Sequence, residues 1–354
     1  MFLLSSATNF STGHNPAKVT PSFKPNSRIN WFESDLEAGS LMPETTDRNN
    51  VSPLHLSANN SHIGIVDLLS GNGPSTKIID QDNTSPLHLA AEGGYTGLLE
   101  LLLSNTLAAP KHDACVVKQL FGKGASIEGM DKDKNTALHL ATRKGHAGAM
   151  ELLLEKGASI VARDLSENTP LHLAAEEGHT GVVELFLRKG ALIEAKGEWG
   201  GTPLHSATKK GQTGVVKLLL GKGASVFARD QFSNTPLHLA AYHGHNHVAK
   251  LLLRGGALVG AIYQYGLTYH SGSTPLHIAA DRGHIGVVKL LLEQGASIRD
   301  TRRDGWTPLE LARRGYHWDV VRLLEKKDAE LSVQINRARP SLLASILNPR
   351  RRGR

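Results

Sequence analysis

Hydrophobic residues recur along this chain in short groups whose spacing predicts pairs of helices. In one representative stretch a first group, L-x-L-A-A, starts at Leu171, and a second, V-V-x-L-F-L, starts at Val182. Thr169 can cap the first helix through its hydroxyl, and Pro170 suits the first helical position, where no backbone donor is needed. Gly178 is expected to end this helix because glycine tolerates the left-handed conformation common there. The second helix is apolar on more than one side, as expected of an element buried between neighbours.

This pattern repeats almost from end to end. Each copy opens with a box of the type T-P-L-H, and the eight boxes begin at Ser52, Ser85, Thr136, Thr169, Thr202, Thr235, Thr274 and Thr307. Five of the seven spacings are 33 residues, and the other two are 51 and 39. A period near 33 residues with this box resembles the ankyrin repeat. The resemblance implies an all-α repeat solenoid of helix-turn-helix repeats joined by β-hairpin turns, in which each unit is stabilised by stacking on its neighbours.

The repeats divide the chain into four parts. We expect a disordered, Ser/Thr/Asn/Pro-rich N-terminal tail (1–29), a degenerate capping half-repeat (30–46), the eight-repeat array (47–330) and a basic C-terminal tail (331–354). One or two amphipathic helical turns are expected within the C-terminal tail.

Two insertions interrupt the period. The one near 104–121 either adds a helix on the outer face or marks a lost half-repeat or gene-model artefact. The one at 260–273 alternates tyrosines at positions 263, 265 and 269, which predicts a β-hairpin finger with one aromatic face. The alternative is that these aromatic rings fold back onto the array.

The positive charge is concentrated in the C-terminal tail. The chain carries a net charge of +7, and from residue 331 onward it has six arginines and no acidic residue. The array is therefore close to neutral, which argues against nucleic-acid binding through the repeats. The tail itself is a solvated charge run, a nuclear import signal, or a contact for anionic membranes or nucleic acid.

Location and assembly are inferred from cysteine content and hydropathy. Cys115 is the only cysteine, so no internal disulfide can form and a reducing compartment is favoured. No segment is long and apolar enough to span a membrane. We expect a monomer that is located in the cytoplasm, the nucleus or both.

Eighteen histidines raise the question of a metal site or a catalytic site. Thirteen of them fall either in the box or in the G-H signal that follows it, and the resemblance implies structural roles for both kinds. Only His243, His245 and His247 are spaced like metal ligands, and His245 is already assigned to the repeat. No catalytic or phosphate-binding motif occurs in a suitable context. We therefore expect no cofactor, no metal, no small-molecule substrate and no enzymatic activity.

The resemblance places the partner-binding surface at the turn tips and at the ends of the first helices. Large aromatic side chains at exposed tips do not serve stacking between units, whereas aromatic anchors dominate binding energy at protein interfaces. The alternative is that these tips pack on neighbouring loops. The candidate partner-binding residues, centred on units five and six, are Trp199, Phe232, Tyr242, Lys209, Lys210, Tyr263, Tyr265, Arg282 and Trp306.

One loop departs from the family pattern. The turn that commonly reads G-A-D-V-N is here Gly-Ala-Ser-Ile or a relative of it, so we expect the loop hydrogen bonds usually made by Asp and Asn to be missing. The Asn position is occupied by Glu128, Val161, Glu194, Phe227 and Arg299.

The function that follows from this sequence is a protein-interaction scaffold or adaptor that holds a partner on its concave and hairpin-tip face. The first alternative is a regulatory array of a larger signalling protein whose basic tail directs nuclear or membrane localisation. The second alternative is an enzyme whose site has no recognisable motif.

Overall fold

A computed structural model describes residues 46–64, 78–103, 125–263 and 271–347 of this protein, with residues 335–347 as backbone only. The predictions for the N-terminal tail, the half-repeat (apart from residue 46) and the 104–121 insertion lie outside these ranges. In the described residues the chain is helical and contains no strand, as expected for an all-α repeat solenoid.

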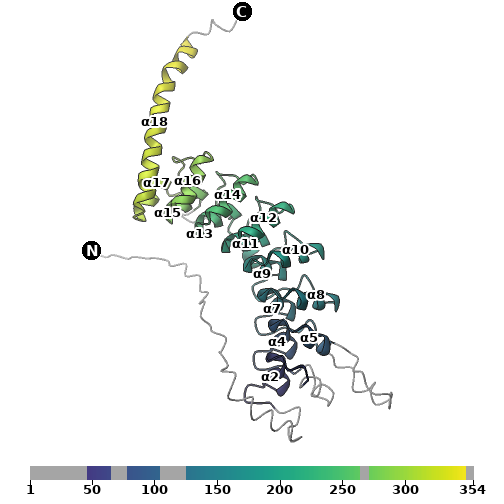
Figure 1. Cartoon of the computed structure of the whole chain (residues 1–354). Helices are drawn as coiled ribbons and strands as arrows, with labels where there is room; N and C mark the ends of the chain where they lie inside the picture. The colour runs from purple at the N-terminus through teal and green to yellow at the C-terminus, as the bar shows by residue number, and fades with distance from the viewer. Residues whose placement is uncertain (1–45, 65–77, 104–124, 264–270, 348–354) are drawn as a thin grey trace, which may run out of the picture.

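The helices form two parallel rows that curve together (Figure 1). The first helices of the eight units line the inner side of the curve and pack on one another in chain order. They are α2 (Pro53–Asn59), α4 (Pro86–Gly93), α7 (Ala137–Lys144), α9 (Pro170–Glu177), α11 (Pro203–Lys210), α13 (Pro236–His243), α15 (Pro275–Asp281) and α17 (Pro308–Arg314). The described second helices form the outer row: α5 (Thr96–Leu103), α8 (Ala147–Glu155), α10 (Thr180–Arg188), α12 (Thr213–Gly221), α14 (Asn246–Arg254), α16 (Ile285–Glu293) and α18 (Trp318–Leu347).

The core is a continuous layer of Leu, Val and Ala between the two rows. In α9 the alanines at 174 and 175 are fully buried, and in α10 Val183 and Phe186 are fully buried as well. Small residues in the first helix let successive units approach closely, and the branched residues of the second helix fill the space behind them. Each unit thus buries its apolar surface only by stacking on its neighbours.

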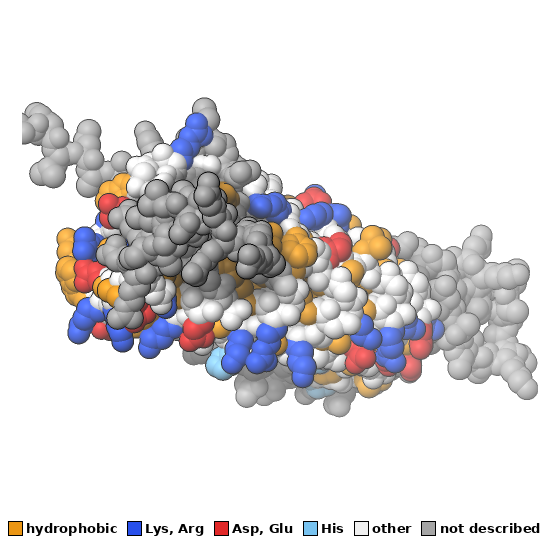
Figure 2. Space-filling view, turned by 90° about the horizontal axis from the view of Figure 1, so that it is seen from above, with side chains coloured by type: hydrophobic (Ala, Val, Ile, Leu, Met, Phe, Trp, Pro, Cys, Tyr) orange, Lys and Arg blue, Asp and Glu red, His pale blue; other side chains and the backbone are white. Residues whose placement is uncertain are grey.

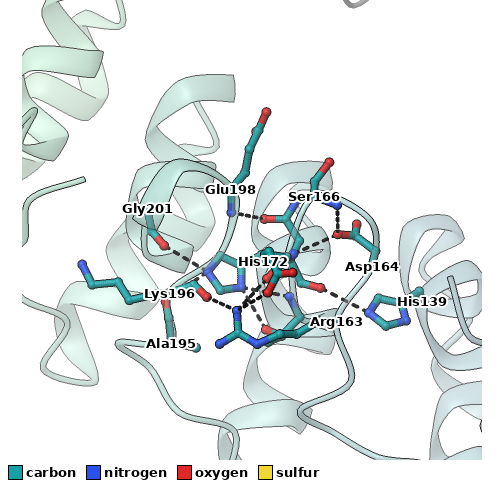
Figure 3. A network of polar contacts seen from close by, with 12 residues as sticks. His139, Arg163, Asp164, Ser166, His172, Ala195, Lys196, Glu198 and Gly201 are labelled. Atoms are coloured by element: carbon teal, nitrogen blue, oxygen red, sulfur yellow. Dashed lines mark hydrogen bonds and ion pairs between the residues drawn. The ribbon is translucent and has the colours of Figure 1, made fainter. Parts of the chain in front are cut away.

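In six of the eight units the box histidine joins the start of the first helix to the turn of the next unit, as Figure 3 shows for His172. In unit four, Nδ1 of His172 accepts from the backbone N–H of Thr169 at 3.2 Å and lies 2.9 Å from the Thr169 hydroxyl. The other ring nitrogen, Nε2, lies 3.0 Å from the carbonyl oxygen of Ala195 and 3.3 Å from that of Gly201. A carbonyl can only accept, so Nε2 carries the proton. The structural role expected for this histidine is confirmed.

A second contact between units forms at the other end of the first helix. Gly211 ends α11 in the left-handed conformation, with φ of 76°. The ring of His245, from the next unit, covers it and donates from Nε2 to the Lys209 carbonyl at 3.2 Å. A Cβ on Gly211 would lie 2.8 Å from this ring, so only glycine fits. Gly178 ends α9 in the same way, which confirms the predicted helix end.

Replacement of Gly211 by alanine should therefore destabilise the array. We expect Gly211→Ala to lower the free energy of unfolding by about 1–3 kcal/mol, because it adds left-handed strain and displaces the His245 hydrogen bond. Gly181→Ala is the matched control, since a Cβ at that helical position meets no atom within 4 Å. Urea unfolding followed by circular dichroism measures both variants, and equal midpoints for the two would contradict this account.

The turns between units are closed by an aspartate in most of the repeats. In unit three, the backbone N–H of Asp131 donates to the carbonyl of Asn135 at 3.0 Å, and the Asp131 carboxylate accepts from the N–H groups of Asp133 and Asn135. Five of the described turn tips also bond to the tip before them, as when the N–H of Leu165 donates to the Asp133 carbonyl at 2.8 Å. The tips are thereby fixed relative to one another.

The expected loss of loop hydrogen bonds is wrong at two positions. The Glu128 carboxylate accepts from the backbone N–H of Ser159 in the next unit at 2.7 Å, and Glu194 accepts in the same way from Ser225 at 2.8 Å. Glutamate is one methylene longer than aspartate and reaches across the unit boundary. These two loops are therefore hydrogen-bonded to the following unit.

The last helix is longer than the sequence predicted. The array was expected to end at residue 330, with one or two helical turns in the tail, but α18 runs without a break from Trp318 to Leu347. Its first half is anchored to the array, because Arg313 forms an ion pair with Glu325 at 2.6 Å and Arg299 forms one with Asp328 at 2.8 Å. Figure 1 shows the rest of α18 extending away from the array.

Candidate functional site

Two aromatic side chains meet across consecutive turn tips. Trp199, in unit five, is 58 % exposed, and its ring lies 5.5 Å from that of Phe232 in unit six, centroid to centroid. The backbone N–H of Gln231 donates to the Trp199 carbonyl at 2.8 Å, which fixes the two tips together. We call Trp199 and Phe232 the tip pair. The alternative in which the tips pack on neighbouring loops holds only for the contact between these two rings, because much of the tryptophan remains in contact with solvent.

The unusual turn of unit five explains why Trp199 projects. Gly197 stands where five of the other turns have aspartate, and a Cβ there would lie 2.6 Å from Oδ1 of Asn168. That amide oxygen instead accepts from the backbone N–H of Glu198 at 2.9 Å (Figure 3). Residues 198–200 form the short 3₁₀ turn η1 (Glu198–Gly200), in which Trp199 takes a left-handed backbone conformation, φ 54° and ψ 28°. A bulky residue in that conformation costs about 1–2 kcal/mol.

Glu198 connects the tip pair to the end of the first helix. Its Oε1 accepts from Nε1 of Trp199 at 3.1 Å, and its Oε2 forms an ion pair with Nζ of Lys209 at 3.2 Å. Lys209 lies near the end of α11, so one carboxylate holds both the indole ring and a lysine of the same unit. This contact brings together two of the predicted site residues, Trp199 and Lys209.

The ends of neighbouring first helices are joined by contacts at equivalent positions. Nζ of Lys144 pairs with Glu92 of the preceding described unit at 3.2 Å, and Nζ of Lys210 pairs with Glu176 at 3.1 Å. In unit seven the same contact has a different chemistry: the guanidinium carbon of Arg282 lies 3.9 Å from the centre of the Tyr242 ring. The predicted site residues Tyr242 and Arg282 are thus in direct contact.

The remaining predicted residues lie further along the array. Trp306 is half-buried at the tip of unit eight, with the guanidinium carbon of Arg314 at 5.4 Å from its ring centre. Tyr263 closes the base of the 260–273 turn, because its N–H donates to the Ser273 carbonyl and its own carbonyl accepts from Gly272, both at 2.8 Å. Tyr265 and the rest of the predicted finger lie outside the described residues.

Four residues that this geometry brings to attention are not among the predicted site residues. Glu198 and Arg314 occupy the tip and helix-end positions at which the resemblance places the partner surface, but they are charged rather than aromatic and are not among the residues chosen. Tyr316, which is 75 % exposed, and Trp318, which is 56 % exposed, form a further aromatic contact at 6.3 Å between ring centres. The sequence does mark Tyr316 as unusual, because a large side chain stands there at a position that is glycine in units two to seven.

The surface carries charges of both signs. In the view from above, Lys and Arg side chains recur along the molecule with fewer Asp and Glu side chains between them (Figure 2). Among the described residues, no group of His, Cys, Asp or Glu side chains is arranged to hold a metal ion. None of the described helices combines the length and the hydropathy needed to cross a bilayer.

Comparison with known families gives one match. A family model described as ankyrin repeats (3 copies) matches residues 35–110, 106–197, 191–263 and 257–335, so its matches extend over most of the chain. No curated protein is similar enough to this chain to count as a match.

Proposed function

This chain belongs to the ankyrin-repeat family, whose repeats are generally protein–protein interaction modules, and we propose that it is a non-enzymatic scaffold that binds a partner protein around units five and six. The partner would contact the tip pair and the ends of α11 and α13. A stack of fixed turns and short helices is a preformed surface, so binding requires little ordering of the chain.

Trp199 is the observation that carries this proposal. Its side chain is exposed, and its backbone is in a conformation that favours glycine or asparagine. Neither property stabilises the fold, because the exposed part of the ring removes little apolar surface from water and the backbone is strained. A partner that covers the ring would supply the missing burial, and buried tryptophans are among the residues that contribute most to binding.

Replacing the tip pair should separate binding from stability. We expect Trp199→Asn combined with Phe232→Ala to weaken partner binding by about 2 kcal/mol or more, which is about thirtyfold. The fold should be nearly unchanged, since asparagine tolerates the left-handed backbone. Proximity labelling in cells, followed by mass spectrometry, compares the labelled proteins of the variant with those of the wild type.

The matched control is Leu192→Ala combined with Leu258→Ala. These two leucines are also exposed and apolar, at 67 % and 62 %, but lie on the loops that follow the second helices. The proposal predicts that a small set of proteins is lost only in the tip-pair variant. An identical set in wild type, variant and control, with equal helicity, would rule out the tip pair as the binding site.

A further inference from the structure

The contact between α13 and α15 differs in charge from the contacts at two equivalent positions earlier in the array. At two earlier boundaries, α4–α7 and α9–α11, a lysine of one unit is neutralised by a glutamate of the unit before it, in the pairs Lys144–Glu92 and Lys210–Glu176. At the boundary between α13 and α15, Tyr242 stands at the position of these two glutamates. The aromatic ring holds Arg282 at 3.9 Å but leaves its positive charge in place.

The same arrangement occurs once more, at the end of the array. Arg314 lies over the Trp306 ring, and both side chains belong to unit eight. Arg282 and Arg314 are exposed, and within the described ranges neither of them forms an ion pair. We call Arg282 and Arg314 the stacked arginines.

The stacked arginines are positioned to bind carboxylates. A guanidinium group that lies on an aromatic ring keeps its N–H groups directed outward in its own plane, and two parallel N–H groups match the two oxygens of a carboxylate. Stacking also restricts the long side chain before a ligand arrives, which lowers the entropy lost on binding. Asp304, close to Trp306 in sequence, does not cancel this charge, because it is already paired with the buried Arg302 at 2.5 Å.

We infer that the ends of α13, α15 and α17 bind an acidic peptide segment of the partner, with Arg282 and Arg314 each receiving an Asp or Glu carboxylate. This inference rests on the proposed function and specifies the chemistry of the partner. The segment would continue along the inner row of helices from the tip pair toward unit eight. A nucleic-acid partner is the competing ligand, because the same guanidinium groups bind phosphate.

A decisive variant is Tyr242→Glu, which would pair the new glutamate of unit six with Arg282 of unit seven, as in the pairs Lys144–Glu92 and Lys210–Glu176. It should keep Arg282 in place while neutralising it, so the fold is retained and only the charge available to a ligand changes. The full chain and this variant are each presented to a random-peptide display library, and the selected peptides are then synthesised and titrated by fluorescence anisotropy. Single-stranded oligouridylate RNA is titrated as the second probe.

The expected result is that the wild type enriches peptides rich in Asp and Glu, and that the Tyr242→Glu protein does not. Each selected peptide should bind about tenfold more weakly to Tyr242→Glu and to Arg282→Gln, and more weakly as salt is raised. Lys144→Gln is the matched control, since that cation is already paired with Glu92 and its removal should leave peptide affinity unchanged.

Three outcomes would overturn the inference. Equal enrichment of acidic residues by wild type and Tyr242→Glu would show that Arg282 selects no carboxylate. The selected peptides could instead be neutral and bind Arg282→Gln as tightly as the wild type, but fail to bind the tip-pair variant. That result would support the proposed function and contradict an acidic partner. Binding of the RNA, with the same dependence on Arg282 and without enrichment of acidic peptides, would assign the stacked arginines to nucleic acid.

Discussion

Acidification from neutral pH to about pH 5 is expected to lower the free energy of unfolding of this protein by about 8 kcal/mol. Burial lowers the pKa of four box histidines, in units three, four, six and seven, from 6.5 to about 4. In the unfolded chain each would titrate near 6.5, so the unfolded state binds more protons between these values. The stabilisation is complete above about pH 6.5 and is lost as the pH falls toward 4, at about 2 kcal/mol per histidine by pH 5.

The geometry of the box explains why the charged form is excluded. Nδ1 of His172 accepts from the backbone N–H of Thr169, so a proton on Nδ1 would place two donors against each other. Urea unfolding measured by circular dichroism at a series of pH values between 7.5 and 5 checks the prediction. A midpoint that stays constant over this range would contradict it, because most carboxylates remain ionised there and contribute little.

Replacing a single box histidine in the middle of the array is expected to have the second largest effect. His172→Gln should lower the free energy of unfolding by about 2–4 kcal/mol, because the carbonyls of Ala195 and Gly201 lose their donor in a buried site. Glutamine is chosen because it can still accept from the N–H of the capping residue, as in the S/T-x-x-E/Q capping box. The measured loss therefore reports on the contact with unit five.

Unit eight provides the control. There Glu310 occupies the box-histidine position, and its Oε2 accepts from both the N–H and the hydroxyl of Thr307 at 2.8 Å. Glu310→Gln should change stability by less than about 1 kcal/mol, since this residue caps a helix without bonding to a following unit. His172→Gln should also make the pH dependence shallower by about 2 kcal/mol at pH 5. Equal losses for the two variants would mean that the histidine acts only as a cap.

The repeated framework could be predicted from sequence because each of its residues has a role that depends only on its neighbours in the chain. Thr169 caps, Pro170 begins the helix and Gly178 ends it, and all three positions are found in the structure where the box placed them. The second contact of His172 came from the family resemblance, because its acceptors, Ala195 and Gly201, lie in the following turn. Local pattern alone does not specify such partners.

The candidate site was less predictable because it depends on departures from the repeat. Trp199 was selected as an exposed aromatic residue, but its left-handed backbone follows from the missing aspartate at Gly197 and the new bond from Glu198 to Asn168. The contact between Tyr242 and Arg282 required the register of two first helices in adjacent units. The sequence predicted only one or two helical turns in the C-terminal tail, whereas α18 continues through Pro340, a residue that lacks the N–H used in a helix interior.

Tyr316 has a consequence for how far this solenoid could be extended. It stands in unit eight at the position of Gly211 and its equivalents, with φ of 59°, and its ring projects into solvent. A further repeat stacked on unit eight would bring its own histidine or glutamine over this position, where in the other units the absence of a Cβ makes room for that side chain. Tyr316 is therefore a steric stop, and engineering a ninth repeat onto this face would first require Tyr316→Gly.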